Sequence, residues 1–283
     1  MKTRIISAIV LIAIFVPLII IGGIPFSITV GIVSALAFKE VIDLRKKEKD
    51  LPSLIKVVGI GCLLLLIFLS HNDYLLNLGL SYKALGLISL TLLIPTIFFK
   101  DTNRYTTKDA FYLMGWTLVL GIFFNSLIVL VNYNVLYLVF LLLITTLNDA
   151  FALIFGKLIG KHKLIPSVSP NKTWEGSICG CIVGTFVAVM FYINILNPQV
   201  GILKIILVVL LLSVMGQIGD LVFSKIKREA KIKDFSNMIP GHGGVLDRFD
   251  SLIFVVITYL IIFIYQSFFS FVFYTILNYL LII

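Results

Sequence analysis

Long apolar runs joined by short polar connections make up most of the chain. A helix needs about 20 apolar residues to cross a hydrocarbon core of about 30 Å, and these runs are of that length. They are continuously apolar, whereas the strands of a membrane β-barrel alternate apolar and polar positions. The pattern therefore predicts an all-α integral membrane protein, a polytopic bundle of about nine transmembrane helices. The predicted helices cover residues 5–21, 24–42, 54–70, 83–99, 110–131, 135–154, 177–196, 201–222 and 249–266.

The two ends of the chain need separate interpretation. The first run resembles a signal peptide, but no small-residue cleavage site follows it, so we interpret it as a retained helix. The uncharged segment 268–283 is almost long enough to span, and it is either a tenth helix or an interfacial one. We divide the chain into residues 1–109, with transmembrane helices 1–4, and residues 110–283, whose transmembrane helices carry the polar segment 224–250.

Composition supports the membrane assignment. The 283 residues are 60% hydrophobic and only 13% charged, and the mean hydropathy is +1.10. About a quarter of the residues in an average soluble domain are charged. This composition excludes a water-soluble globular protein.

Positive charge is concentrated on one side of the predicted bundle. If the N-terminus is cytoplasmic, the connections that return to its side are residues 43–53, 100–109, 155–176 and 223–248. With the adjoining helix ends, that side holds all of the 23 Lys and Arg residues except Lys83 and Lys204. The positive-inside rule then predicts a multi-pass protein of the inner (cytoplasmic) membrane, with its N-terminus and the polar segment in the cytoplasm.

The polar segment 224–250 combines positive charge, negative charge and a glycine-rich turn. Its cationic residues are Lys225, Lys227, Arg228, Lys231, Lys233 and Arg248, and its carboxylates are Glu229, Asp234, Asp247 and Asp250. The turn consists of Pro240, Gly241, His242, Gly243 and Gly244, where a backbone without side chains can approach a ligand or metal. The positive-inside bias alone would explain many of the lysines, so their number is not evidence for a binding site.

Acidic residues recur near the cytoplasmic ends of several predicted helices. Asp149 and Asp220 each lie near the end of an apolar run, and Asp247 and Asp250 lie where the last run begins. An acid in a membrane helix is costly, so a functional site is its default interpretation. The alternative is that Asp149 pairs with a loop lysine and that Asp247 or Asp250 complements a helix N-terminus. The recurrence at one depth favours a site.

The connection 155–176 adds polar side chains on the same side. Asn171 and Lys172 follow Pro170 just before a predicted helix, a position suited to anion binding. As a bare motif this is weak, because the nearby Glu175 fits equally well as a capping carboxylate.

Glycines form a stripe along the predicted helix 177–196. Gly176, Gly180 and Gly184 recur every four residues and leave one helix face bare. We interpret the stripe as a surface for close helix packing, within a protomer or across a dimer, rather than as a catalytic feature.

Together these residues favour phosphate chemistry at the membrane surface. Carboxylates are the usual protein ligands of magnesium, which binds through one or two of them plus substrate phosphates. The nearby bases would hold phosphate oxygens. No nucleophile elbow, Walker loop or zinc signature is present in the sequence. The residues alone therefore predict a metal-dependent phosphoryl or nucleotidyl transfer.

One long motif within the polar segment is similar to that of a known family. It consists of Ser224, Ile226-Lys227-Arg228, Lys233-Asp234, Ser236, Ile239-Pro240, His242-Gly243-Gly244-Val245 and Asp247-Arg248-Phe249-Asp250. This arrangement resembles the signature of the CDP-diacylglycerol synthases, or phosphatidate cytidylyltransferases. Asn148-Asp149-x-Phe151-Ala152 and the stretch from Ser169 to Gly176 also resemble that family. The resemblance covers the chain from Asn148 onward.

The resemblance implies an activity and a metal centre. The family transfers CMP from CTP to phosphatidic acid, releasing pyrophosphate and giving CDP-diacylglycerol for phospholipid synthesis. Its enzymes depend on Mg²⁺, and the acids that match Asp220 and Asp247 are taken as ligands of a paired-metal centre whose second ion could be monovalent. Two cations about 3.5–4 Å apart would steady the attacking and leaving oxygens.

On this basis we assign residue roles as hypotheses. Catalysis is assigned to Asp220, Asp247, Lys227, Arg228 and Asp250, with metal held by Asp220 and Asp247. Binding of the triphosphate or the lipid phosphate is assigned to Lys227, Arg228, Lys233 and Arg248, with Asn171 and Lys172 reaching in from the neighbouring loop. Orientation of cations or bases is assigned to Asp149, Asp234 and Asp250, and shaping of the nucleotide loop to His242, Gly243 and Gly244.

Two activities other than CMP transfer also fit these residues. A CTP-dependent lipid-alcohol kinase would share the nucleotide and the membrane but transfer the γ-phosphoryl group. An ion-coupled transporter would also place acids in helices, although its sites usually lie near the bilayer midplane between inverted repeats. The expected partners are CTP, phosphatidic acid, the lipid bilayer and a second copy of the chain in a homodimer, with no nucleic acid.

Overall fold

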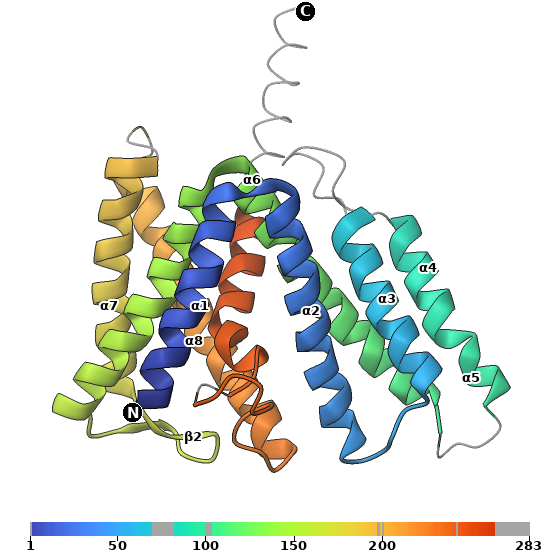
Figure 1. Ribbon diagram of the computed structural model, residues 1–283. Helices are drawn as coiled ribbons and strands as arrows, with labels where there is room; N and C mark the ends of the chain where they lie inside the picture. Colours follow the sequence, from blue (N-terminus) through green and yellow to red (C-terminus); the bar gives the residue numbers. More distant parts are fainter. Residues whose placement is uncertain are drawn as a thin grey trace, which may run out of the picture.

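The computed structural model describes residues 2–69, 82–99, 104–196, 199, 201–241 and 243–263. Most of this backbone is helical (Figure 1). The helices are α1 Lys2–Ile21, α2 Gly23–Lys46, α3 Ser53–Leu69, α4 Tyr82–Leu93, α5 Pro95–Phe98, α6 Thr107–Leu158, α7 Trp174–Phe191 continued by the π-helix η2 Tyr192–Leu196, and α8 Ile202–Glu229. A last helix covers residues 246–263 and is called the 246–263 helix below. The segment 268–283 lies outside the described residues.

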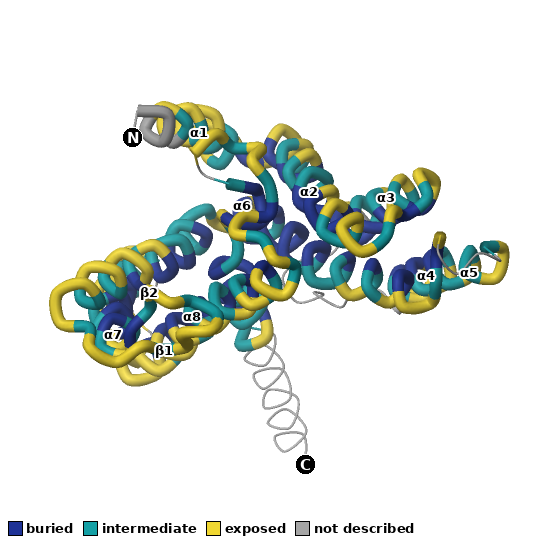
Figure 2. Tube along the Cα trace, turned by 90° about the horizontal axis from the view of Figure 1, so that it is seen from below, coloured by how far each residue is buried: buried dark blue, intermediate teal, exposed yellow. Residues whose placement is uncertain are grey.

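The helices carry an apolar outer surface. Among the described residues, four helical segments are long and apolar enough to cross a membrane, namely Gly23–Lys46, Thr107–Leu158, Trp174–Leu196 and Ile202–Glu229. Large apolar side chains point outward from them, with Ile24 76% and Leu203 70% exposed. Figure 2 shows such exposed positions along the outer sides of α1, α4 and α7. The chain is therefore a mostly α-helical membrane protein, which confirms the predicted class.

Helix α6 consists of two arms that meet at Asn134. Asn134 has an extended backbone, with φ −165° and ψ 114°, inside the 52-residue helix. Its side-chain oxygen accepts a 2.9 Å hydrogen bond from the backbone N–H of Leu136, as an N-cap residue does. The cap starts the second arm at the boundary between the predicted helices 110–131 and 135–154. Figure 1 shows the two arms diverging from this point.

The two arms organise the rest of the bundle. Helices α2, α3 and α4 pack along α6, and α7 and α8 pack against it as well. On the first arm, the amide of Asn125 donates a 2.7 Å hydrogen bond to the Ile67 carbonyl of α3, and the Tyr112 hydroxyl donates a 3.0 Å bond to the Val41 carbonyl of α2. Figure 1 shows α7 beside the second arm.

A β-hairpin lies between α6 and α7. Strands β1 Lys163–Ile165 and β2 Ser169–Thr173 pair antiparallel, with Lys163 opposite Thr173 and Ile165 opposite Ser169. The prediction of an all-α protein omitted this element, because strands of three and five residues leave too little periodicity to detect. The hairpin brings Lys172 next to the helix ends.

The glycine stripe of α7 packs within the chain. A Cβ atom added at Gly180 would lie 2.6 Å from the Asn148 carbonyl oxygen and 2.8 Å from the Ala152 nitrogen, both in the second arm of α6. A Cβ atom at Gly176 would lie 2.4 Å from the Ala152 carbonyl oxygen. Backbone thus touches backbone here, as small residues permit in membrane helices. Of the two predicted uses of the stripe, the structure shows the one within a protomer.

The packing at Gly180 predicts a stability difference between two glycine substitutions. Gly180→Ala should lower the free energy of unfolding by about 1–3 kcal/mol, because the new methyl group meets backbone atoms that cannot move aside. Gly61→Ala is the matched control, since a Cβ atom there has nothing within 4 Å. Thermal or denaturant unfolding in detergent measures both, and equal stability of the two variants would contradict the packing.

Candidate active site

Acids near the ends of three helices lie close together. Gly219 lets α8 approach the 246–263 helix so closely that a Cβ atom there would lie 2.8 Å from the Asp250 carbonyl oxygen. Asp250 interacts electrostatically with both Asp220 of α8 and Asp149 of α6, and Asp149 interacts with Asp220. The three carboxylates therefore form one group at which three helices converge, and we call it the acidic centre.

Two lysines bring positive charge to the acidic centre. Lys172 of β2 forms an ion pair with Asp220 and also interacts electrostatically with Asp149. Lys227 of α8 interacts electrostatically with Asp250. Both lysines belong to the predicted site. The predicted alternative for Asp149, in which a loop lysine compensates it, thus describes only part of the arrangement, because that lysine pairs with Asp220.

Asp247 organises the signature loop, the segment from Asp234 to Leu246. Its Oδ1 atom accepts a 2.8 Å hydrogen bond from Lys227 Nζ. Its Oδ2 atom accepts backbone N–H bonds of 2.8 Å from Phe235 and 2.9 Å from Gly244. The side chain is 4% exposed, and Lys227 is 10% exposed. Asp247 is therefore a buried, ion-paired carboxylate that joins both ends of the loop.

Gly243 allows the loop to close around Asp247. It has φ 84°, a conformation that favours glycine, and a Cβ atom there would lie 2.9 Å from Asp247 Oδ2. The loop narrows at an isolated antiparallel bridge between Ile239 and Gly243. His242 lies outside the described residues.

Sequence reasoning missed one buried acid that contacts the same loop. Glu40 of α2 is 1% exposed. It accepts hydrogen bonds from the Ser236 hydroxyl at 2.6 Å and from the backbone N–H groups of Val245 at 2.8 Å and Leu246 at 2.9 Å. Its signal was an acid within the apolar run 24–42, the same signal that made Asp149 a candidate.

The remaining predicted site residues differ in their contacts and exposure. Arg228 donates to the Val168 carbonyl at 3.4 Å and to the Ile232 carbonyl at 3.0 Å, so it links α8 to the hairpin turn. Gly244 is buried, with Glu40 directly beside it. The other predicted residues, which are exposed, are Asn171, Lys233, Asp234 and Arg248.

The carboxylates of the site fit a magnesium ion whose coordination is completed by substrate phosphates. Among the described residues, no three His, Cys, Asp or Glu side chains form a metal-binding group by themselves. Magnesium does not require one, because it binds through one or two carboxylates together with water and substrate phosphates. The ammonium groups of Lys172 and Lys227, paired with Asp220 and Asp247, occupy positions where these carboxylates accept a cation.

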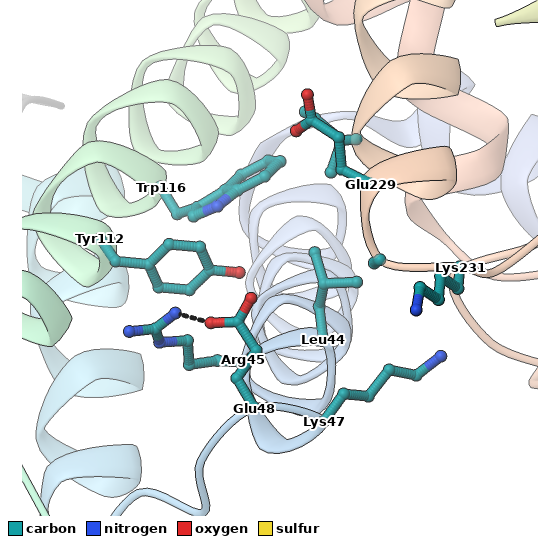
Figure 3. Close-up of a pocket in the computed structure, with 10 residues that line it drawn as sticks. Leu44, Arg45, Lys47, Glu48, Tyr112, Trp116, Glu229 and Lys231 are labelled. Carbon is teal, nitrogen blue, oxygen red and sulfur yellow. Dashed lines mark hydrogen bonds and ion pairs between the residues drawn. The ribbon is translucent and has the colours of Figure 1, made fainter. Parts of the chain in front are cut away.

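A pocket of about 540 Å³ lies at the ends of α2, α6 and α8 (Figure 3). Arg45, Tyr112, Trp116 and Lys231 line it, and none of the predicted site residues does. Arg45 pairs there with Glu48, marked by the dashed line in Figure 3, and with buried Asp109 at 2.7 Å. The pocket is therefore separate from the acidic centre.

An apolar groove of about 460 Å³ lies between α1, α2, α6 and the 246–263 helix. Its lining residues are Leu11, Phe15, Ile19, Phe26, Val30, Val33, Leu36, Phe124, Leu127, Leu138, Leu142, Met238, Ile239, Val245, Arg248, Phe249 and Leu252. Arg248 is the one charged residue in this lining, to which it contributes only apolar atoms. Its neighbours Met238, Ile239 and Val245 belong to the signature loop, so one end of the groove adjoins that loop.

The chain matches the model of a protein family and is similar in sequence to several known proteins. The model of the cytidylyltransferase family matches residues 2–268. A phosphatidate cytidylyltransferase of Staphylococcus haemolyticus is 36% identical over 261 residues, covering 90% of this chain and 96% of that protein. Proteins of the same name from Staphylococcus aureus (strain COL) and Bacillus subtilis (strain 168) are 37% and 35% identical, over 257 and 262 residues. They cover 90% of this chain in both cases, and 96% and 94% of the relatives.

The buried Lys227–Asp247 pair predicts a large stability effect. Lys227→Met should lower the free energy of unfolding by about 3–5 kcal/mol, because it leaves a buried carboxylate without its counter-charge. Lys225→Met is the matched control, since Lys225 lies on the same helix with its side chain 66% exposed. Thermal unfolding in detergent measures the difference, and similar shifts for both variants would show that the pair contributes little.

Proposed function

The chain belongs to the cytidylyltransferase family, and from that premise we propose that its acidic centre carries out CMP transfer from CTP to phosphatidate. The products are CDP-diacylglycerol and pyrophosphate. The observation that carries the proposal is the meeting of Asp149, Asp220 and Asp250 from three helices with Lys172 and Lys227. Such a centre suits a reaction between two polyanions, because it offers charges of both signs at one place.

The reaction needs positioning and charge neutralisation more than acid–base chemistry. A phosphatidate oxygen attacks the α-phosphorus of CTP, a new P–O bond forms, and the bond between the α-phosphorus and its bridging oxygen breaks to release pyrophosphate. Phosphatidate is already an anion, so no strong general base is required. Lys172 and Lys227 lie where they can turn from carboxylates to phosphate oxygens, and Arg228 holds the hairpin beside them.

We assign the metal to the carboxylates that face the lysines. Asp220 and Asp247 would hold Mg²⁺, with Asp149 and Asp250 adding negative charge nearby. When bound, the ion supplies charge neutralisation at the phosphate oxygens. Asp247 would take part through Oδ1, because two backbone N–H groups occupy Oδ2. The same proposal includes a second cation at the paired-metal centre, which could be monovalent.

We place the acidic centre at the cytoplasmic face of the inner membrane. The Ser7 hydroxyl donates a 3.0 Å hydrogen bond to the Pro240 carbonyl, so the start of α1 and the signature loop share one side of the bundle. The distribution of Lys and Arg then supports a cytoplasmic location for both. Nine transmembrane helices and a homodimer remain part of the proposal. Because the α7 glycine stripe is used within the chain, a dimer would use another surface.

We further propose that the apolar groove holds an acyl chain of phosphatidate. Between Leu11 and Ile19 the groove follows α1 for about 12 Å at 1.5 Å per residue, roughly one leaflet of a hydrocarbon core of about 30 Å. Its volume lies within the range of about 300–1,000 Å³ that is typical of ligand sites. Arg248 at the loop end of the groove would pair with the lipid phosphate. Arg248 and Asp250 face different sides of the 246–263 helix, so the headgroup would lie across its first turn.

Labelled CTP tests the reaction. With purified protein, phosphatidate and Mg²⁺, label from the α-phosphate should enter the lipid and pyrophosphate should appear, while γ-label in the lipid would contradict CMP transfer. Asp220→Asn should lower kcat by roughly 10²-fold or more, because it removes a charge at the reacting phosphates. Glu229→Gln, on the same helix and exposed, is the control and should leave kcat unchanged.

Groove filling tests the acyl-chain site. Val33→Trp should raise the KM for a long-chain phosphatidate by roughly tenfold, because each methylene displaced from the groove forfeits about 0.8 kcal/mol. The KM for CTP, and that for a phosphatidate with very short chains, should not change. Ile32→Trp is the control, since Ile32 neighbours Val33 on α2 but is 59% exposed. Equal effects on long and short chains would remove the groove from substrate binding.

A further inference from the structure

Two carboxylates from opposite halves of the chain hold the two ends of the signature loop. Asp247 accepts from the N–H groups of Phe235 and Gly244. Glu40 accepts from the next donor at each end, the Ser236 hydroxyl and the Val245 N–H, and also from the Leu246 N–H. The donors at each end of the loop are thus divided between a residue of the signature and a residue of α2, about 200 positions earlier in the chain.

We propose that Glu40 is a positioning residue for CMP transfer, which holds the signature loop in its reactive shape from α2. This inference rests on the proposed function of the acidic centre. Glu40 acts through the loop, because its three acceptor contacts are all made to loop atoms. Val245 and Leu246 lead directly into the 246–263 helix, which carries Asp247 and Asp250.

The contacts are too specific for a buried acid that only fills space. The Ser236, Val245 and Leu246 donors lie 2.6–2.9 Å away, within the usual range for hydrogen bonds to a carboxylate. Both oxygens of Glu40 are used. The Val245 and Leu246 N–H groups lie at the start of a helix, where backbone donors have no partner within the helix and negative charge is favourable.

Gly244 is matched to Glu40. A Cβ atom at this position would lie 2.5 Å from Glu40 Oε1 and 2.8 Å from its Oε2 and Cδ atoms. The backbone can therefore reach the carboxylate only where no side chain intervenes. Gly243 has the same relation to Asp247. The two adjacent glycines of the signature thus each make room for one of the two carboxylates.

The position of Glu40 gives the N-terminal half of the chain a part in the site. Helix α2 is fixed independently of the loop, because Tyr112 of α6 binds the Val41 carbonyl and Asp109 of α6 binds Arg45. A residue on this helix can therefore act as a fixed reference for a loop that follows α8. Loss of the Glu40 contacts should free the loop while leaving the α2–α6 packing in place.

Glu40→Gln tests the proposal because the two side chains have nearly the same shape. Whichever way the amide is oriented, its NH₂ group faces the N–H of Val245 or of Leu246, so at least one backbone donor is left unpaired. We expect kcat for CMP transfer from α-labelled CTP to fall by roughly 10²-fold. Hydrogen exchange should accelerate in the peptide 235–246 and stay unchanged in α2 and α3. Asp43→Asn, one turn further along α2 and exposed, is the matched control and should behave as the wild type.

A second variant keeps the test decisive if Glu40→Gln fails to fold. Ser236→Ala removes one donor and leaves the backbone contacts, so kcat should fall by roughly fivefold, with faster exchange confined to the same peptide. Wild-type kcat per folded molecule in these variants, or faster exchange throughout the bundle, would overturn the positioning role. Absence of CMP transfer by the wild type would instead overturn the proposed function, so the two failures are distinguishable.

Discussion

The structure depends on the requirement that buried polar groups be paired where water is scarce. An unpaired backbone N–H or carboxylate buried away from water is costly, and the cost rises as the surroundings become apolar. The signature loop meets this requirement with two acids. Asp247 and Glu40 take up donors at both ends of the loop, and Lys227 compensates the charge of Asp247. The loop shape therefore follows from pairing rather than from a regular secondary structure.

The same requirement explains why residues far apart in sequence must meet. A carboxylate on α8, on α6 or on the 246–263 helix would be expensive in isolation. Gly219 lets the last two helices of the described chain come close enough to gather Asp220 and Asp250. On the other side, the glycine stripe of α7 brings that helix against Asn148, whose amide donates to the Ser213 carbonyl of α8 at 3.0 Å. Close packing and polar pairing are thus parts of one arrangement.

Much of this could be predicted from sequence because it depends on local chemistry. Apolar run lengths located the helices, and acids at the run ends indicated Asp149 and Asp220 as candidates, which the structure brings near each other. The ion-pair and hydrogen-bond partners of these acids could not be predicted, because they depend on how the helices pack. Asp247 was predicted as a metal ligand, whereas its contacts show a loop organiser as well; its metal role remains a prediction. Glu40 was overlooked because the run 24–42 was assigned as membrane helix without asking what its single acid would bind. The β-hairpin that positions Lys172 was too short to detect.

The lysines of the acidic centre connect its stability to its proposed chemistry. Each of Lys172 and Lys227 is paired with a carboxylate, so Asp220 and Asp247 are compensated, while Asp149 and Asp250 leave an excess of negative charge before substrate arrives. A triphosphate and a divalent cation would enter with opposite charges, one suited to the lysines and the other to the acids. Exchange of partners can then keep Lys172, Lys227, Asp220 and Asp247 paired throughout binding, which avoids the desolvation cost of an unpaired ion. A site with carboxylates alone would repel both substrates, and a site with lysines alone would hold the phosphates without a place for the cation.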